Sequence, residues 1–168
     1  MIVIMAGLPG TGKTTLACAL AASTAGRVVS KDEIRSALFA PAEIEYSTRQ
    51  DDFCLQVMLD LVRYLLQRDS KQLIFLDGRP FSRRYQIQNV LTAAGSLHQP
   101  WHILECMCDE NLVRVRLQEQ VGHHASNRDF DLYLRVKEQF EEITEPKTII
   151  DTGQALEACV QRGLAALG

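Results

Sequence analysis

The stretch Gly7-Leu8-Pro9-Gly10-Thr11-Gly12-Lys13-Thr14 matches the pattern G-x-x-x-x-G-K-[S/T], which is typical of a loop that binds phosphate groups. Its glycines let successive backbone N–H groups point at phosphate oxygens, and the helix that follows adds the positive end of its dipole. We expect Lys13 to contact the β and γ phosphates and the Thr14 hydroxyl to ligate Mg²⁺. The alternative is a glycine-rich turn that matches this pattern by chance, which we expect in roughly one of a few hundred chains of this length. The sequence therefore predicts a nucleotide-phosphate site over Gly7 to Thr15.

Short apolar runs alternate with longer helical patterns on both sides of this loop. The predicted strands are Ile2–Ala6, Val28–Ser30, Leu73–Leu76, His102–Met107 and Lys147–Ile150. The predicted helices are Thr14–Thr24, Asp32–Phe39, Thr48–Arg68, Ser82–Ala94, Asn111–Val121, Asp129–Ile143 and Ala155–Leu167. Such alternation predicts an α/β fold, a parallel sheet with helices on both faces that binds its ligands at the carboxyl ends of its strands.

Two of these helices have specific predicted features. The helix Thr48–Arg68 is expected to begin with a capping pair, Thr48 and Asp51 three residues later. Its buried stripe is expected to consist of Phe53, Val57, Leu61 and Leu65. Ser82–Ala94 is expected to end at Gly95.

The composition is that of a folded domain with no strong charge. The 168 residues are 46% hydrophobic and 23% charged, with a net charge of −3, so we expect one domain over residues 1–168 and find no global electrostatic reason for nucleic-acid or membrane binding. The start at Met1 to Ala6 has no basic leader, and a cytoplasmic protein is expected. The five cysteines, with Cys106-x-Cys108 the only close pair, lack a zinc spacing and are read as packed thiols.

The phosphate loop leaves three classes of protein open: a phosphotransferase, a regulatory GTPase and a mechanical ATPase. The chain has no Asn-Lys-x-Asp guanine-recognition motif. It also has no room for the helical second domain of a ring-forming ATPase. A small phosphotransferase is therefore favoured.

Three aspartates follow predicted strands and should meet at the edge that holds the loop. We expect Asp77 to be the carboxylate that holds Mg²⁺, directly or through water. The structural alternative is that Asp77 only forms a turn with Gly78. Asp32, behind a Ser30–Glu33 capping box, is read as the base that orients an acceptor hydroxyl, the alternative being a favourable interaction with the helix dipole. Asp109 is assigned to helix capping.

Arginines are expected to supply positive charge to the γ phosphate, with surface ion pairs as the alternative for each. Arg79, Arg83 and Arg84 follow the third strand, and a short lid is expected over about residues 114–128, with Arg114, Arg116 and Arg128 as candidates. Arg114 and Arg116 lie two positions apart on a helix, about 200° around its axis, so only one of them should face the site.

These segments together resemble one family. The phosphate loop, Ser30-Lys31-Asp32-Glu33-Ile34-Arg35, Asp77-Gly78, Arg83-Arg84 and Ser126-Asn127-Arg128 are similar to the small bacterial zeta-toxin and polynucleotide-kinase-like P-loop kinases, with chloramphenicol phosphotransferase and gluconate kinase as more distant relatives. The resemblance covers nearly the whole chain. Its loop is specific to nucleotide binding, whereas the rest marks a family of kinases rather than one substrate.

The resemblance implies a nucleoside-kinase-like P-loop fold with a five-stranded parallel sheet ordered 2-3-1-4-5, and ATP and Mg²⁺ as cofactors. By position, Lys13 and Thr14 serve phosphate and metal, Asp32 activates the acceptor, Arg35 and Arg84 lie at the acceptor, and Arg116 is the lid arginine nearest the transferred phosphate. Two departures are visible, since Glu119 and Gln120 stand where relatives often carry a second lid arginine, and Arg79-Pro80 where they often carry a small polar residue.

The sequence thus predicts an ATP-dependent phosphotransferase that acts on a hydroxyl of a small molecule, as a monomer or dimer and with no membrane partner. A polynucleotide 5′-hydroxyl kinase, using Arg79, Arg83 and Arg84 as a local basic strip, is the first alternative. A regulatory ATPase without an acceptor is the second.

Overall fold

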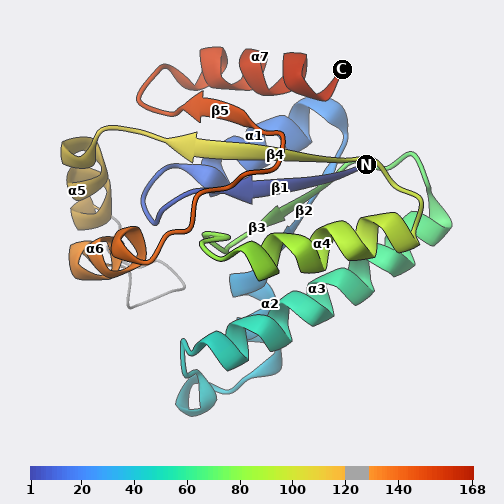
Figure 1. Ribbon diagram of the computed structural model, residues 1–168, viewed down its shortest axis with the longest axis horizontal. Coiled ribbons are helices and arrows are strands. Elements are labelled where there is room, and N and C mark those ends of the chain that lie inside the picture. The colour runs from blue at the N-terminus through green and yellow to red at the C-terminus, as the bar shows by residue number, and fades with distance from the viewer. Residues whose placement is uncertain (120–128) are drawn as a thin grey trace.

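A computed structural model describes residues 1–119 and 129–168 of the chain. Five parallel strands form one sheet in the order β2-β3-β1-β4-β5, which confirms the expected order (Figure 1). The strands are β1 (Ile2–Ala6), β2 (Arg27–Ser30), β3 (Ile74–Asp77), β4 (Trp101–Met107) and β5 (Thr148–Asp151). Each lies within one residue of its predicted position. In β1, β3 and β4 the strand signal is a buried apolar run.

The helices cover both faces of the sheet, as predicted. They are α1 (Lys13–Thr24), α2 (Lys31–Leu38), α3 (Thr48–Arg68), α4 (Arg84–Ser96), α5 (Glu110–Glu119), α6 (Phe130–Glu138) and α7 (Leu156–Leu167), with a short 3₁₀ turn, η1, at Pro41–Glu43. In Figure 1, α3 and α4 lie along one face and α1 and α7 along the other, while α5 and α6 stand beyond the arrowheads of the strands. The carboxyl edge of the sheet is therefore the edge that these last two helices flank.

Strand β1 shows why the sheet is covered on both faces, since all five of its residues are buried. Alternate side chains of a strand point to opposite faces. Ile2 and Ile4 join the core under α3 and α4, whereas Val3 and Met5 join the core under α1 and α7.

Helix α3 has the predicted bounds but a different cap and a different buried face. Ser47, not Thr48, is the N-cap, and its hydroxyl accepts a hydrogen bond from the Gln50 N–H. Phe53 is 54% exposed, so its place in the buried stripe was wrong. Leu61 and Leu65 of the predicted stripe are half-buried against the core. The buried apolar positions are the ones that follow the predicted stripe, namely Cys54, Leu55, Met58, Leu59, Val62 and Leu66. This face packs on the sheet because those residues form the broader apolar surface.

Two predicted helix ends were also wrong. Helix α4 continues through Gly95 to Ser96, and an added Cβ at Gly95 would meet no atom within 4 Å. Helix α6 ends at Glu138 rather than Ile143. Beyond it the Glu141 N–H donates to the Ser82 carbonyl, and Ile143 is buried in the core, so the chain turns toward the sheet instead of continuing the helix.

The cysteines are all free thiols. Cys54, Cys106 and Cys159 are buried, as expected of packed thiols, but Cys18 is exposed on α1, where packing was the wrong interpretation. No helix in the described part of the chain is both long enough and apolar enough to cross a bilayer.

Candidate active site

The phosphate loop joins β1 to α1 in a backbone conformation that requires glycine. Gly7, Gly10 and Gly12 have φ of 128°, 77° and 76°, a region that other residues rarely adopt. A Cβ at Gly7 would lie 2.3 Å from the Cys106 carbonyl oxygen of β4. The loop therefore fits closely against the edge of the sheet.

The N-terminus of α1 is open to an anion. Its N-cap, Gly12, has no side chain to cap the first N–H groups, and the first turn has no acidic residue. Lys13 reaches back over the loop, and its Nζ donates to the Leu8 carbonyl at 2.7 Å. Unsatisfied N–H groups, a helix dipole and an ammonium group together favour the binding of phosphate.

Thr14 and Asp77, the two predicted metal ligands, meet at the base of the loop. The Thr14 hydroxyl donates to Oδ2 of Asp77 at 2.7 Å. Asp77 is 1% exposed, and its Oδ1 has no hydrogen-bond partner in the described part of the chain. Two oxygen ligands of this kind fit Mg²⁺, which is usually held by one or two protein groups together with nucleotide phosphates. No cluster of three or more His, Cys, Asp or Glu suited to a metal occurs among the described residues.

A cavity of about 120 Å³ lies on one side of the loop. Lys13 and Asp32 both line it, so the phosphate-loop lysine and the proposed base face the same space. Asp32 is 8% exposed, and its Oδ1 lies 3.4 Å from Arg35 Nη1. The lining is Pro9, Lys13, Lys31, Asp32, Arg35, Tyr46, Asp51, Gly78, Arg79, Pro80, Leu132 and Val136. We call this cavity the acceptor-side pocket.

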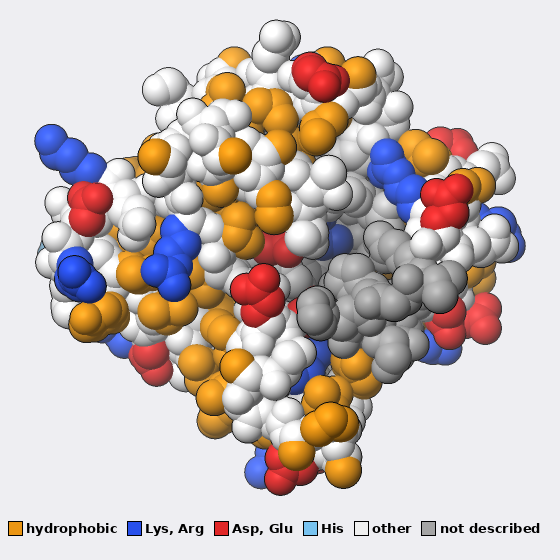
Figure 2. All heavy atoms as spheres, turned by 180° about the vertical axis from the view of Figure 1, so that it is seen from behind, with side chains coloured by type: hydrophobic (Ala, Val, Ile, Leu, Met, Phe, Trp, Pro, Cys, Tyr) orange, Lys and Arg blue, Asp and Glu red, His pale blue; other side chains and the backbone are white. Residues whose placement is uncertain are grey.

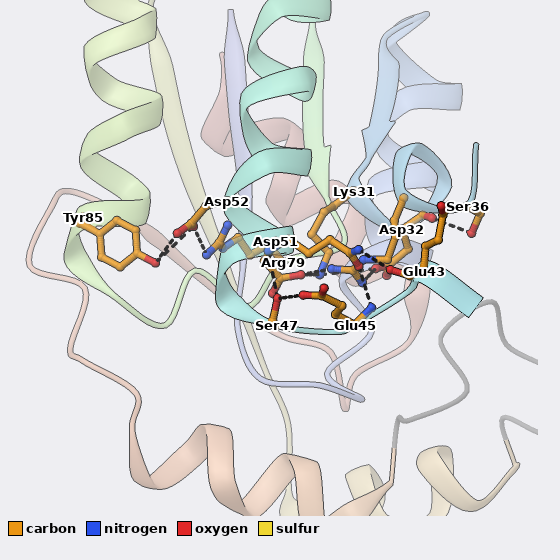
Figure 3. Close-up of polar contacts among 12 residues, drawn as sticks. Lys31, Asp32, Ser36, Glu43, Glu45, Ser47, Asp51, Asp52, Arg79 and Tyr85 are labelled. Carbon is orange, nitrogen blue, oxygen red and sulfur yellow. Dashed lines mark hydrogen bonds and ion pairs between the residues drawn. The ribbon is translucent and has the colours of Figure 1, made fainter. Parts of the chain in front are cut away.

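Asp51, at the first turn of α3, ties two cations of this pocket together (Figure 3). Its Oδ1 accepts from Lys31 Nζ at 2.9 Å and from Arg35 Nη2. Burial alone would raise the pKa of Asp51, but Lys31, Arg35 and Arg79 outweigh it, and the pKa lies below its usual value. The Arg35 guanidinium also stacks over the Tyr46 ring, 5.1 Å from its centroid. Lys31 and Arg35 are therefore held in place before any ligand arrives.

Arg79 occupies the loop after β3 and is 2% exposed. Its Nη2 donates to Oδ1 of Asp52 at 2.6 Å, and the hydroxyl of Tyr85 donates to the same carboxylate (Figure 3). Nε and Nη1 of Arg79 have no hydrogen-bond partner in residues 1–119 and 129–168. A buried guanidinium with unused donors is costly unless something else satisfies it.

A second cavity, of about 380 Å³, lies on the other side of the loop. Gly10, Gly12, Thr15 and Arg116 line it together with the loop after β5. The Arg116 guanidinium donates to the Thr152 carbonyl at 2.8 Å, and the Thr152 hydroxyl donates to the Thr11 carbonyl at 2.8 Å. We call this cavity the nucleotide-side pocket.

Of the other predicted arginines that the structure describes, Arg83, Arg84 and Arg114 do not line either pocket. Arg114 stacks over the Phe130 ring, 3.8 Å from its centroid, so only Arg116 of this pair faces the site, as the helical spacing predicts. Arg84 is exposed at the start of α4, and its N–H donates to Glu141. Arg128 lies outside the described residues, as do all residues of the expected lid beyond Glu119. Asp109 caps α5, its carboxylate accepting from the Asn111 N–H at 2.8 Å.

A family model described as an AAA domain matches residues 2–143. The chain belongs to this family. No curated protein sequence shows significant similarity to this AAA domain.

Solved structures share the fold of this AAA domain at low sequence identity. A gluconokinase from Sinorhizobium meliloti 1021 superposes with a TM-score of 0.73 at 17% identity, over 99% of this chain and 90% of that one. The APS kinase CysC from Mycobacterium tuberculosis, in complex with AMPPNP and APS, superposes with a TM-score of 0.74 at 13% identity, over 99% of this chain and 96% of that one. Kti12 from Chaetomium thermophilum, in complex with ADP-AlF3, gives 0.69 at 15%, over the whole of both chains. The fold of this AAA domain is thus that of the P-loop kinases.

Sequence reasoning missed several residues of the two pockets. Asp51 was read only as part of the start of α3 and Asp52 was not considered, although two adjacent carboxylates at a helix N-terminus are a signal for cation partners. Tyr46, with φ of 48°, and Thr152 lie in irregular segments that periodicity does not describe. Arg79 was noted as a departure from the family pattern, and its burial beneath the pocket was not foreseen.

Proposed function

We propose that the protein is an ATP-dependent phosphotransferase that moves the γ-phosphate of ATP to a hydroxyl of a small-molecule acceptor. One observation carries the proposal: the acceptor-side and nucleotide-side pockets both lie against the phosphate loop, and Lys13 and Asp32 together line the acceptor-side pocket. A pocket that contains both the phosphate-loop lysine and a carboxylate can hold a second substrate in line with the γ-phosphate. The fold shared with a gluconokinase and an APS kinase supports the same class of reaction. A cytoplasmic location, where ATP is available, belongs to the proposal.

In this reaction the two pockets hold different parts of the reactants. The loop N–H groups and Lys13 bind the β and γ phosphates, and the nucleotide-side pocket under Arg116 receives the rest of the nucleotide. Thr14 and Asp77 would hold Mg²⁺, which neutralises charge on the β and γ phosphates when bound. Arg116 already donates to Thr152, so it is positioned at the loop without a ligand.

On the acceptor side, Asp32 accepts a hydrogen bond from the acceptor hydroxyl and orients its oxygen toward the γ phosphorus. The new P–O bond forms as the bond to the oxygen bridging the β and γ phosphorus atoms breaks, ADP leaves, and the hydroxyl proton passes to Asp32. Because the transition state of phosphoryl transfer is loose, the main contribution of such a carboxylate is to position the nucleophile.

The two alternatives have less support. For a polynucleotide kinase, the small volume of the acceptor-side pocket is unfavourable, Arg79 is buried rather than part of a basic strip, and Figure 2 shows Lys and Arg scattered among Asp and Glu on the face it presents. The regulatory ATPase keeps some support from the fold shared with Kti12, in complex with ADP-AlF3. A regulatory ATPase has no acceptor, so this alternative gives no reason for Asp32 to line the acceptor-side pocket.

A screen with γ-labelled ATP and magnesium tests the proposal. Label should appear in one or more small hydroxyl compounds, and Lys13→Ala should remove it. Label in 5′-hydroxyl oligonucleotides alone would favour the polynucleotide kinase. Release of inorganic phosphate at one rate, whatever acceptor is present, would favour the regulatory ATPase.

A further inference from the structure

The acceptor-side pocket contains more hydrogen-bond donors than its own acceptors use. Lys31, Arg35 and Arg79 line it together, and a guanidinium carries N–H donors on all three of its nitrogens. Nε of Arg35 and both Nε and Nη1 of Arg79 are buried without a partner in the described part of the chain. Such groups are normally satisfied by protein, water or ligand.

The cations are also buried more deeply than the carboxylates that accompany them. The side chains of Lys31, Arg35 and Arg79 are 7%, 3% and 2% exposed, whereas those of Asp32, Asp51 and Asp52 are 11%, 23% and 39% exposed. Solvent weakens the field of a partly exposed carboxylate more than that of a buried cation. Among the described residues that line the pocket, four cations face two carboxylates, those of Asp32 and Asp51, so positive charge predominates inside it.

From these two observations we infer that the acceptor is an anion, a small hydroxyl compound that carries a carboxylate or a phosphate group, and that Arg79 and Lys31 are the residues that select it. The inference rests on the proposed function and names its acceptor class. An anionic group supplies both the charge and the oxygen acceptors that the pocket lacks. A neutral polyol would supply oxygen acceptors alone.

The test measures γ-phosphate transfer from ATP to matched pairs of acceptors. One set pairs short polyhydroxy acids with the neutral polyols of equal chain length, and a second pairs sugar phosphates with their parent sugars. The anionic member of at least one pair should have a kcat/KM at least about tenfold higher than the neutral member. The set in which this occurs tells whether the anionic group is a carboxylate or a phosphate.

Variants of Arg79 test whether this residue causes the preference for anionic acceptors. Arg79→Gln should raise the KM for the anionic acceptor about tenfold or more while leaving the KM for ATP within about twofold, and Arg79→Lys, which keeps the charge, should retain part of the preference. Arg63→Gln is the matched control, because it removes an equal charge from an exposed ion pair with Asp60. If Arg79→Gln does not fold, Lys31→Gln provides the same comparison.

The outcomes separate this inference from the proposed function. Transfer to neutral members that equals or exceeds transfer to the anionic ones would overturn the anionic acceptor and leave the phosphotransferase standing. If Arg79→Gln lowered transfer to the anionic and to the neutral acceptors by the same factor, and Arg79→Lys restored no preference for the anionic one, the role of Arg79 would be overturned. No transfer to either member of any pair would overturn both proposals.

Discussion

At the scale of single residues, Lys13 is the group that distinguishes a nucleotide site from a glycine-rich turn. Its ammonium is buried and donates to the Leu8 carbonyl. Lys13→Ala should weaken ATP binding by about 2–5 kcal/mol, roughly 30-fold or more, because a nearly desolvated charge pair is lost. Titration calorimetry with ATP and magnesium measures this, with the exposed Lys71→Ala as control. Equal binding heats in the two variants would contradict the assignment.

Asp32 should affect catalysis rather than nucleotide binding. Asp32→Asn keeps the shape of the side chain but cannot take the proton, so transfer should fall by about 10²-fold or more while ATP affinity is nearly unchanged. Glu33→Gln, on the same turn of α2 and exposed, is the matched control. Wild-type transfer rates in Asp32→Asn would remove Asp32 from the mechanism.

Asp51 links the site to the stability of the fold. Because its pKa lies below the usual 3.8, its charge stabilises the native state above that value, and this contribution is lost as pH falls through the lowered pKa. Asp51→Asn should therefore cost about 1–3 kcal/mol at neutral pH and progressively less below about pH 4. Urea unfolding of both proteins from pH 7 downward measures the difference. A difference that stays constant as pH falls below 4 would show that the charge of Asp51 is not the cause.

At the scale of elements, α3 offers a direct comparison of a buried and an exposed residue on one helix. Met58 is fully buried in the core, whereas Phe53 is 54% exposed and packs edge-on against Phe39. Met58→Ala should cost about 2–5 kcal/mol of unfolding free energy, and Phe53→Ala less than about 1 kcal/mol. Chemical denaturation gives both values. A larger loss of unfolding free energy for Phe53→Ala than for Met58→Ala would mean that the stripe predicted from the sequence, which contains Phe53, is the buried one.

The same helix shows how far sequence reasoning reaches. Its bounds follow from local signals, a serine or threonine start and a long amphipathic run. Its buried face depends on what it packs against, which the sequence of the helix alone does not contain. Likewise the meeting of Thr14 and Asp77, the proposed metal ligands, could be predicted, because the segments after β1 and β3 lie at one edge of a parallel sheet. Arg79 could not be placed, since an arginine in a loop is usually exposed and its burial follows from Asp52, 27 positions away.

At the scale of the whole molecule, the parallel sheet gathers the loops that follow all five strands at one edge. Strand β1 in the centre places the phosphate loop between the loops after β3 and β4, so one reactant can lie on each side (Figure 1). The acceptor-side pocket is formed by α2, α3 and the loop after β3, and the nucleotide-side pocket by α5 and the loop after β5. Such an arrangement suits transfer between two bound molecules better than hydrolysis.

The most direct test of this account is the fate of the γ-phosphate when wild-type protein turns over labelled ATP with and without a candidate acceptor. We predict that adding the acceptor speeds the consumption of ATP and that the additional label is recovered in the phosphorylated acceptor, with little in inorganic phosphate. An unchanged rate of ATP consumption, with all of the label in inorganic phosphate, would contradict the account.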